Sequence, residues 1–396
     1  MKKLINDNSG GALVIVLGLM LLLTIAAILA VHTAQTDIDL SFNQVDYDHA
    51  FYIADAGLKK AFNELNKDNF WSAGYLEMAF EDGAYTVITE RDIPVTDSAF
   101  DPITDRVTLR STASYRESQA NLRAVVVPEL FYPFKYAVYG EDGILMDNNS
   151  ETDSYNSDDG AYVDSLAGTE GDVASNGTIV LENSALVNGD ASSSLTGGVS
   201  VCATCGVTED VSDAAEPFEI PPIPDSVFTY YESNNDNITG VDPVTSMIYP
   251  GPDLILAIAD TITLTTGVYY FNDITMNSNS VIILDPTDPD VEVKIYIRGT
   301  LTLDNNTTIN PNNDPTDCLI FSDGQIVTIG NDTEIYAAFY GPDADVDLGN
   351  SCDWYGSIIA ESVSMVNTGS LHYDEALAPI PITTTGNMLM ISWIED

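Results

Sequence analysis

The feature that most constrains this chain is an uncharged run near its N-terminus. Residues 12–31 contain no charged side chain and a single hydroxyl group, on Thr24. At ~1.5 Å per residue, a helix of this length matches the ~30 Å hydrocarbon core of a bilayer. Lys2 and Lys3 precede the run and most acidic residues follow it. The positive-inside bias therefore predicts a cytoplasmic N-terminus, with everything after residue 32 exported.

A cleavable signal peptide is the alternative interpretation of this run. Its apolar region usually spans about 7–15 residues and ends at a small-x-small cleavage site. The run here is longer, and cleavage after Ala30 or Ala34 would place Ile28 or His32 where a small residue is required. The pattern therefore favours a retained membrane-spanning helix.

Charge divides the chain into two regions. The 396 residues include 61 acidic and 13 basic side chains, a formal charge of −48. Residues 136–396 hold only Lys294 and Arg298 against 43 acidic residues. This balance excludes a nucleic-acid-binding protein, because phosphate binding needs clustered lysine and arginine. With 45% apolar residues and 20 tyrosines, the chain can still bury the cores of two to three domains.

The region after the apolar run has α+β character. In residues 49–65 (HAFYIADAGLKKAFNEL), apolar side chains recur at helical spacing, which predicts that the helix continues to about residue 67. We expect a small antiparallel sheet over residues 68–134, with a loop around Pro94 and Pro102. Its predicted strands are residues 83–90, 106–115 and 118–128.

The distal region, residues 135–396, reads as all-β. It holds three quarters of the asparagines, 21 of 28 lying at or beyond Asn148, and it repeats a short apolar strand followed by a polar turn. Strands start near residues 274, 301, 327, 346 and 363, at intervals of 27, 26, 19 and 17 residues. Such intervals predict a right-handed parallel β-helix whose asparagine-rich corners adopt left-handed conformations. A β-sandwich is the alternative, and residues 217–225 (PFEIPPIPD) predict a rigid crossing between coils.

The junction at Gly11 resembles the class III leader of type IV pilins, and specifically of PilX-type minor pilins. Those leaders are short, basic and polar, and they end in glycine before a small residue and an aliphatic run, as in Gly11-Ala12-Leu13-Val14-Ile15-Val16. The helix at 49–65 is similar to the family's second signature, with Asp55 in its acidic position.

The resemblance implies a domain order and a processing step. Residues 1–11 would be a leader that prepilin peptidase removes between Gly11 and Ala12. Residues 12–67 would form the N-terminal helix, and residues 68–134 the pilin-like sheet. The acidic region 135–396 resembles the β-helix-like domain that often follows PilX-type N-termini, through short strings such as VNGD at 187–190 and LHYDEAL at 371–377.

The resemblance also implies a function. The chain would be a non-enzymatic minor pilin, anchored in the inner membrane by a single pass and then incorporated into an extracellular filament with major and minor pilins. Most major pilins carry glutamate where Val16 stands, and that carboxylate neutralises the amino terminus of a neighbouring subunit. Its absence predicts low copy number at the tip, because a buried unpaired ammonium is costly. The acidic domain would serve adhesion or partner contact, in a type IV pilus or a type II secretion pseudopilus.

Four cysteines lie in the part predicted to be exported. An even number outside the cytosol favours disulfides, with Cys202 and Cys205 closing a local loop and Cys318 and Cys352 joining neighbouring coils. A zinc site and a redox CxxC motif are the alternatives. The second pair lacks the CxxC spacing of zinc sites, and no thioredoxin-like βαβ pattern surrounds the first.

One acidic segment resembles the start of a calcium loop. Asp343, Asp345 and Asp347 alternate with apolar residues, but the following glycine and the twelfth position do not fit an EF-hand. The alternative is a solvated strand face with Ala344 and its neighbours pointing inward. A second acidic loop comprises Asp147, Glu151, Asp153, Asp158 and Asp159. No other cofactor is expected.

Two functional alternatives remain open. A tethered β-helix polysaccharide hydrolase would need two carboxylates, but among 43 acidic residues an aspartate pair has little weight. The three histidines, His32, His49 and His372, form no catalytic string, and we nominate no catalytic residue. A surface adhesin that never enters a filament is the other alternative.

Overall fold

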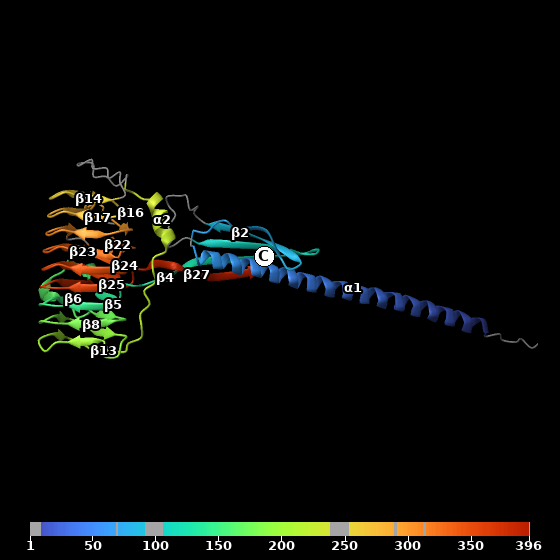
Figure 1. Ribbon diagram of the computed structural model, residues 1–396. Coiled ribbons are helices and arrows are strands. Elements are labelled where there is room, and N and C mark those ends of the chain that lie inside the picture. The colour runs from blue at the N-terminus through green and yellow to red at the C-terminus, as the bar shows by residue number, and fades with distance from the viewer. Residues whose placement is uncertain are drawn as a thin grey trace, which may run out of the picture.

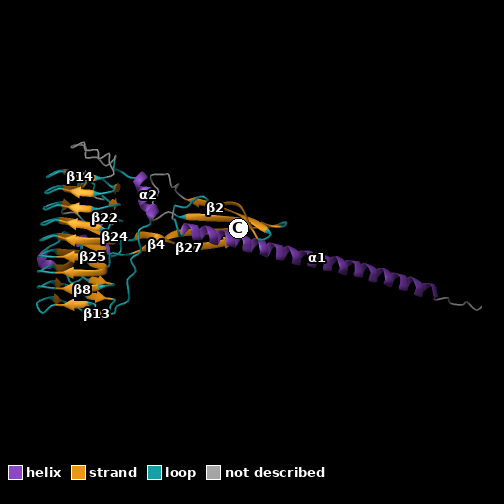
Figure 2. Cartoon of the chain, viewed as in Figure 1, coloured by secondary structure: helices purple, strands orange, loops and turns teal. Residues whose placement is uncertain are grey.

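The computed structural model describes residues 9–68, 70–91, 106–237, 253–288, 291–311 and 314–395, without the side chains of 9–12 and 383–387. A long helix leads into a small antiparallel sheet, and a tall stack of parallel strands stands across the far end of that sheet (Figures 1 and 2). The predicted order, an apolar helix followed by a mostly β region, is confirmed.

The N-terminal unit is helix α1 (Ser9–Leu65) packed on a five-stranded antiparallel sheet. The sheet follows the order β1-β2-β3-β4-β27, and its strands are β1 (Tyr75–Phe80), β2 (Gly83–Arg91), β3 (Val107–Tyr115), β4 (Ser118–Phe131) and β27 (Ile382–Glu395). Strands β2, β3 and β4 contain the three predicted strand runs. The loop predicted around Pro94 and Pro102 lies outside the described residues.

The predicted assignment of the C-terminal residues to the acidic domain is wrong for strand β27. The sequence places all of residues 135–396 in the acidic domain, yet β27 returns to the N-terminal sheet and pairs antiparallel with β4. The pairing covers the edge of β4, whose backbone groups would otherwise face solvent. Trp393 of β27 also packs edge to face against Phe51 of α1, with ring centroids 5.7 Å apart.

The coil stack, residues 138–374, is built from parallel pairings between successive turns of chain. Its lower arm in Figure 1 contains β5 (Val138–Met146), β6 (Glu151–Tyr155), β7 (Val173–Ser175), β8 (Thr178–Leu181), β9 (Leu186–Val187), β10 (Ala191–Ser193), β11 (Val199–Val201), β12 (Gly206–Val207) and β13 (Val211–Asp213). The 3-10 turns η1 (Ser157–Asp159) and η2 (Asp164–Leu166) interrupt it.

The upper arm begins at the opposite end of the stack (Figure 1). It contains β14 (Leu254–Leu256), β15 (Thr261–Leu264), β16 (Gly267–Phe271), β17 (Ile274–Met276), β18 (Val281–Leu284), β19 (Val293–Ile297), β20 (Leu301–Leu303), β21 (Thr308–Ile309), β22 (Cys318–Ser322), β23 (Ile326–Ile329), β24 (Glu334–Leu348), β25 (Asp353–Met365) and β26 (Ser370–Asp374). Two further 3-10 turns are η3 (Pro315–Asp317) and η4 (Glu375–Leu377).

The two arms meet in the middle of the stack. Strands β25 and β26, the last of the upper arm, pair in parallel with β5 and β6, the first of the lower arm. Parallel pairing between turns of chain differs from the antiparallel sheets of the β-sandwich alternative. The chain therefore enters and leaves the stack at neighbouring coils.

A crossing segment carries the chain from one end of the stack towards the other. It includes the proline-rich residues 217–224 and helix α2 (Asp225–Ser233). Ile223, Phe228 and Tyr231 are buried against a column of mostly aromatic side chains on the outer face of the stack. That column is Tyr270, Tyr296, Phe321, Tyr340, Ile359, Tyr139 and Ala174.

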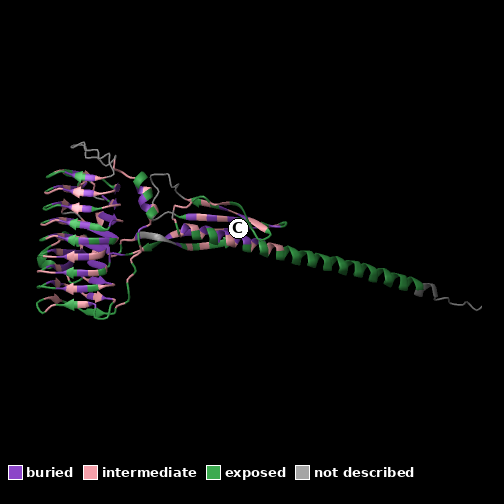
Figure 3. Ribbon diagram, viewed as in Figure 1, coloured by how far each residue is buried: buried purple, intermediate pink, exposed green. Residues whose placement is uncertain are grey.

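The interior of the stack is a continuous apolar core, and buried residues run through most of its height (Figure 3). Strand alternation points every second residue inward, and parallel register places like residues on top of one another. One interior column crosses both arms: Ile262, Ile282, Ile309, Ile335, Trp354, Leu371, Thr152, Val187 and Val207.

The corners of the stack share one backbone conformation. In eight coils a residue with positive φ lies two positions before a strand, and asparagine and serine each supply it more than once. These residues are Ala259, Asn279, Asn306, Asp332, Ser351, Thr368, Asn149 and Ser184. Neighbouring asparagines also bond between coils; for example, the Asn350 backbone N–H donates to Asn331 Oδ1 over 2.9 Å. Asparagine tolerates this conformation better than most side chains, as the composition predicts.

Candidate functional sites

The first candidate site is the bare part of α1. Of the described residues, only this helix is long and apolar enough to cross a membrane, with a mean hydropathy of 3.1 in its most apolar window. From Leu13 to Val45 its large apolar side chains are exposed (Figure 3). Val16 is 52% exposed. This stretch needs an apolar environment, either a bilayer or other helices.

The predicted processing junction lies at the start of this helix. Gly11 and Ala12 fall within the first turn of α1, and their side chains are not among those described. Residues 1–8 of the predicted leader lie outside the described residues. Cleavage between Gly11 and Ala12 stays a prediction.

The signature segment 49–65 lies where α1 meets the sheet. Ala54, Leu58 and Ala61 are at most 1% exposed and pack against β2–β4. Gly57 permits this approach, because a Cβ there would lie 2.8 Å from both Ser111 Oγ and Tyr85 Cδ2. Asp55, in the acidic position of the signature, pairs with Lys59 at 2.7 Å.

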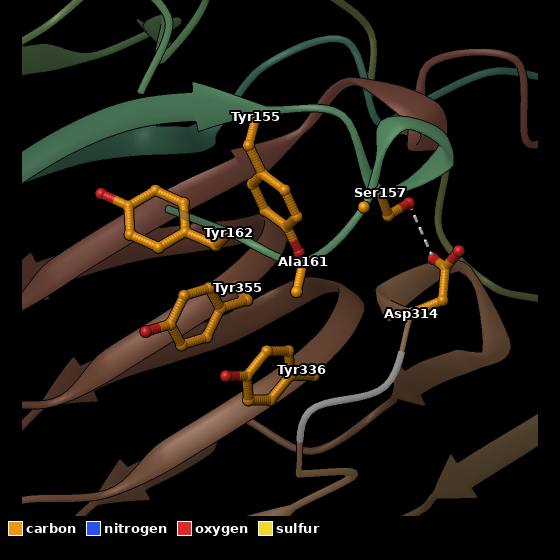
Figure 4. Close-up of a pocket in the computed structure, with 8 residues that line it drawn as sticks. Tyr155, Ser157, Ala161, Tyr162, Asp314, Tyr336 and Tyr355 are labelled. Atoms are coloured by element: carbon orange, nitrogen blue, oxygen red, sulfur yellow. Dashed lines mark hydrogen bonds between the residues drawn. The ribbon is translucent and has the colours of Figure 1, made fainter. Parts of the chain in front are cut away.

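The second candidate site is a pocket of about 280 Å3 on the outer face of the coil stack (Figure 4). It lies where the arms meet, between the loop after β6 and the strands β24 and β25. Its lining is Tyr155, Ser157, Gly160, Ala161, Tyr162, Asp314, Tyr336 and Tyr355. None of these side chains is basic.

Parallel register builds the aromatic wall of this pocket. Tyr336, Tyr355 and His372 occupy equivalent positions on successive coils, and Asp153 follows on the next. The rings of Tyr336 and Tyr355 are stacked, with centroids 4.2 Å apart and planes at 7°. Tyr155 stands edge-on to Tyr355. The rings are held by the backbone of four coils rather than by one loop.

Behind this wall, a buried histidine fixes the position of two aromatic rings. His372 Nδ1 lies 2.6 Å from Asp153 Oδ1, and both residues are buried. The Tyr162 hydroxyl donates to the other oxygen of Asp153 over 2.7 Å. The imidazole ring also packs against Tyr162 and Tyr355.

The opposite side of the pocket is rich in hydrogen-bond acceptors. The Ser157 hydroxyl oxygen lies 2.7 Å from Asp374 Oδ2 and 3.0 Å from Asp314 Oδ1. One hydroxyl proton can serve only one of these carboxylates at a time. Asp374 is buried, and its burial, with a smaller effect from Asp314, raises its pKa above the ordinary value. Asp374 also accepts from the Ser157 and Ala376 backbone N–H groups, and Asp314 from the backbone N–H and hydroxyl of Thr316. The pocket therefore has negative charge, and no basic side chain lines it.

The pocket tyrosines remain neutral at physiological pH. Burial, followed by the charges of Asp353 and Glu334, raises the pKa of Tyr355 to about 12. Burial also raises the pKa of Tyr155, with Asp374 and Asp314 adding to the shift. Neutral phenol rings keep the electron-rich faces that attract cations.

The predicted calcium residues do not form a compact site. Asp343, Asp345 and Asp347 are exposed along β24, whereas Ala344 and Val346 between them are buried. The Ser362 hydroxyl donates to Asp345. Within the described ranges, no group of three acidic, histidine or cysteine side chains is placed to hold a metal ion. The geometry is that of a solvated strand face.

The second acidic loop is also dispersed. Asp153 is buried beside His372, whereas Asp158 and Asp159 are exposed in η1. Asp147 accepts hydrogen bonds at a coil corner, from Asn148 and Asn183.

The cysteines behave differently in their two pairs. Cys202 and Cys205 form a disulfide. Cys318 and Cys352 are buried free thiols, so the predicted bridge between them is absent. Cys318 aligns with Ala337 on the next coil, while Cys352 aligns with Thr333, four residues away along the strand. That offset is about 13 Å along the strand, in addition to the coil spacing, which is too far for a disulfide.

The tyrosine pocket was not predicted from the sequence, although the spacing of its aromatic residues could have indicated it. Tyr336 to Tyr355 spans 19 residues and Tyr355 to His372 spans 17. These are the intervals between the last predicted strand starts. Outward aromatic residues at the repeat interval of a coil stack must lie above one another.

The N-terminal signatures have a direct counterpart among known families. Residues 9–59 match the family model described as PilX N-terminal. This segment of the chain is a PilX-type N-terminus. Behind it, residues 288–380 match a domain of unknown function, DUF7305. No curated protein matches the chain.

Solved structures with similarity to this chain are distant. An ice-binding protein from the Antarctic ascomycete Antarctomyces psychrotrophicus is 12% identical, over 62% of this chain and 97% of that one, with a TM-score of 0.36. The competence-associated pilin ComZ from Thermus thermophilus is 11% identical, over 89% and 97%, with a TM-score of 0.27. An ice-binding protein from Shewanella frigidimarina is 15% identical, over 63% and 98%, with a TM-score of 0.32. Nothing about ligands or partners follows from scores this low.

Proposed function

We propose that this PilX-type chain is a non-enzymatic minor pilin that enters a type IV pilus or a related filament at low copy, at the tip. Removal of residues 1–11 would expose Ala12 as the new N-terminus. Helix α1 would pack with the helices of major and minor pilins, and the coil stack would be presented outward for adhesion or partner contact. We also propose that the stack is a right-handed parallel β-helix.

The observation that carries this proposal is how the stack is attached. The chain enters the stack at β5 and leaves it at β26, and these strands belong to neighbouring coils in its middle. The arms consequently extend to both sides of the sheet, like a crossbar at the end opposite the start of α1 (Figure 1). A crossbar of this kind is easier to accommodate at the end of a helical array than between close-packed neighbours along its shaft.

Charge supports the same position. Residues 136–396 carry 43 acidic and two basic side chains. Copies repeated along a shaft would bring these domains within the ~8 Å Debye length of physiological salt, where like charges repel. A single copy at the tip avoids that repulsion.

The position can be tested by immunogold labelling of filaments with antibodies against the coil stack. We expect label at filament ends. Deletion of the gene should reduce filament number or adhesion while leaving the fold of the major subunit intact. Uniform label along the shaft would contradict tip placement.

Processing can be tested on the same material. N-terminal sequencing of the mature protein should begin at Ala12, and a Gly11→Val variant should retain the leader and stay in the membrane. A mature protein that keeps Met1 would favour the non-filament adhesin. A start near Val31 or Gln35 would instead indicate an ordinary signal peptide.

A further inference from the structure

We infer that the tyrosine pocket at the junction of the two arms binds an organic ammonium group. This inference deepens the proposed function, because it names what the exposed coil stack would recognise. The pocket combines aromatic rings, carboxylates and a rigid backbone, and each of these features argues for a cation.

The pocket has unbalanced negative charge. Asp314 lines it, and Asp374 lies on the other side of the Ser157 hydroxyl. Both carboxylates accept hydrogen bonds from neutral donors of the protein, but no basic side chain lines the pocket. An ammonium group supplies the missing positive charge. An anionic ligand would add to the imbalance, and a neutral ligand would leave the charge unbalanced.

The pocket also has an aromatic wall. Tyr155, Tyr336 and Tyr355 line the same pocket as Asp314. Tyr355 is stacked between Tyr336 and His372. An ammonium group would therefore meet the rings of Tyr155 and Tyr336 rather than a face of Tyr355. Tyrosine rings attract organic cations through their electron-rich faces, and this attraction grows when the site is partly shielded from water. Aromatic rings combined with carboxylates are the usual surroundings of a bound ammonium group.

Among the described residues, the chain also lacks a competing cation at this pocket. Residues 136–396 contain only Lys294 and Arg298 as lysine or arginine. Arg298 pairs with Asp225 and Asp323 at the α2 side of the stack, and neither basic residue lines the pocket. His372 faces the buried Asp153.

The pocket is also preorganised. Tyr336 and Tyr355 stand on consecutive coils in parallel register, and their rings are already stacked. The Tyr336 hydroxyl donates to Glu334 over 2.9 Å, which restrains its ring. A ligand would therefore find the wall formed, at little cost in side-chain entropy.

Two matched pairs of small molecules test the inference by calorimetry on the full-length protein in a nonionic detergent. Choline is compared with 3,3-dimethyl-1-butanol, which has the same shape without the charge. Butylammonium is compared with 1-butanol. Choline represents a lipid-type headgroup and butylammonium a lysine side chain, so the tighter cation indicates the source of the natural ligand. We expect at least one cation to bind with at least roughly tenfold higher affinity than its neutral partner.

Variants distinguish the pocket from general attraction to an acidic protein. Asp314→Asn keeps the size and the hydrogen-bonding oxygen and should weaken cation binding roughly tenfold. Asp343→Asn, on the exposed row of β24, changes net charge equally and should leave binding unchanged. Tyr336→Leu should weaken binding roughly 2- to 30-fold, whereas Tyr336→Phe, which keeps the ring, should not.

Equal binding of the charged and neutral members of both pairs would overturn the inference, as would equal effects of Asp314→Asn and Asp343→Asn. Tighter binding of glucose than of either cation would also overturn it. These outcomes are independent of filament labelling: a pocket that binds no cation leaves tip placement untouched, and shaft labelling leaves the binding result untouched.

Discussion

Cys318 and Cys352 lie in the interior of the coil stack as small apolar side chains rather than as a cross-link. Burial raises the pKa of the Cys318 thiol to about 12, with a smaller effect from Asp317. Both thiols should therefore resist alkylation in the folded protein. The disulfide of Cys202 and Cys205 lies in the turn between β11 and β12 of the lower arm.

Mass spectrometry can count these thiols. We expect no addition of iodoacetamide to the native protein, two additions after denaturation without reductant, and four after reduction. Zero additions in the denatured, unreduced protein would mean that Cys318 and Cys352 are bonded after all, which would require a different register of the coils.

The absence of a glutamate at position 16 is one of the grounds for the proposed tip position. A glutamate at this position would supply the carboxylate that a neighbouring amino terminus lacks. We expect Val16→Glu to increase the number of copies per filament in quantitative immunoblots of purified filaments, because the buried ammonium would then be paired. Val16→Gln is the matched control and should not increase it. No difference between the two variants would show that bulk and charge, rather than Val16, set the copy number.

At the scale of the element, the corner is the feature that sequence reasoning captures best. Asn306 is exposed and has a φ of 55°, within the range of 52° to 73° that its counterparts at the other corners have. Alanine in the left-handed region costs roughly 1–2 kcal/mol, whereas glycine adopts it without steric penalty. We therefore expect Asn306→Ala to lower the unfolding temperature of the stack and Asn306→Gly to lower it less. Thermal unfolding followed by circular dichroism tests this, and equal losses would mean that the side chain rather than the backbone matters.

Strand starts and corners are predictable because they are local. The predicted starts at 274, 301 and 327 agree within one residue with the starts of β17, β20 and β23, whereas 346 and 363 lie late in β24 and β25, which begin at Glu334 and Asp353. Each follows from a few residues of alternating pattern and a polar turn. Tyr336 and Tyr355 of the pocket, and His372 behind them, recur at the spacing of the later coils, so the sequence shows that they lie above one another once the register is known.

The order of the coils is not local and could not be predicted. Nothing in β5 or β25 alone indicates that the first coil of the lower arm stacks under the last coils of the upper arm. Strand β27 has an apolar pattern that fits either sheet, and its partner β4 is more than 250 residues earlier in the chain. Which strand pairs with which partner depends on the sheet edges that remain unpaired after the other strands have folded. The predicted disulfide between Cys318 and Cys352 was wrong for a similar reason. The number of residues between two cysteines does not say where each of them lies along the strand direction of its coil.

At the scale of the whole molecule, excess negative charge should make stability depend on pH. Several partly buried carboxyl groups have pKa values above their ordinary range, chiefly because burial disfavours the charged form; these include Asp172, Asp323, Asp353 and Asp374. For Asp317, burial and then the charges of Asp314 and Glu292 raise the pKa to about 6.

The sign of the effect follows from proton binding. Between the ordinary aspartate pKa of about 3.9 and the raised value, the folded protein binds more protons than the unfolded chain. The free energy of unfolding therefore increases as the pH falls from about 7 towards 5. This direction is opposite to that of proteins whose carboxylates are stabilised by ion pairs.

We expect the unfolding temperature of the coil stack to rise, in calorimetry, as the pH falls over this range. Asp317→Asn should flatten the rise by removing one raised group, whereas Asp347→Asn, on the exposed row, should lower the net charge equally without removing a buried carboxyl. A fall in unfolding temperature between these pH values would show that attractive contacts of the carboxylates, and not their burial and mutual repulsion, dominate the electrostatics of the stack.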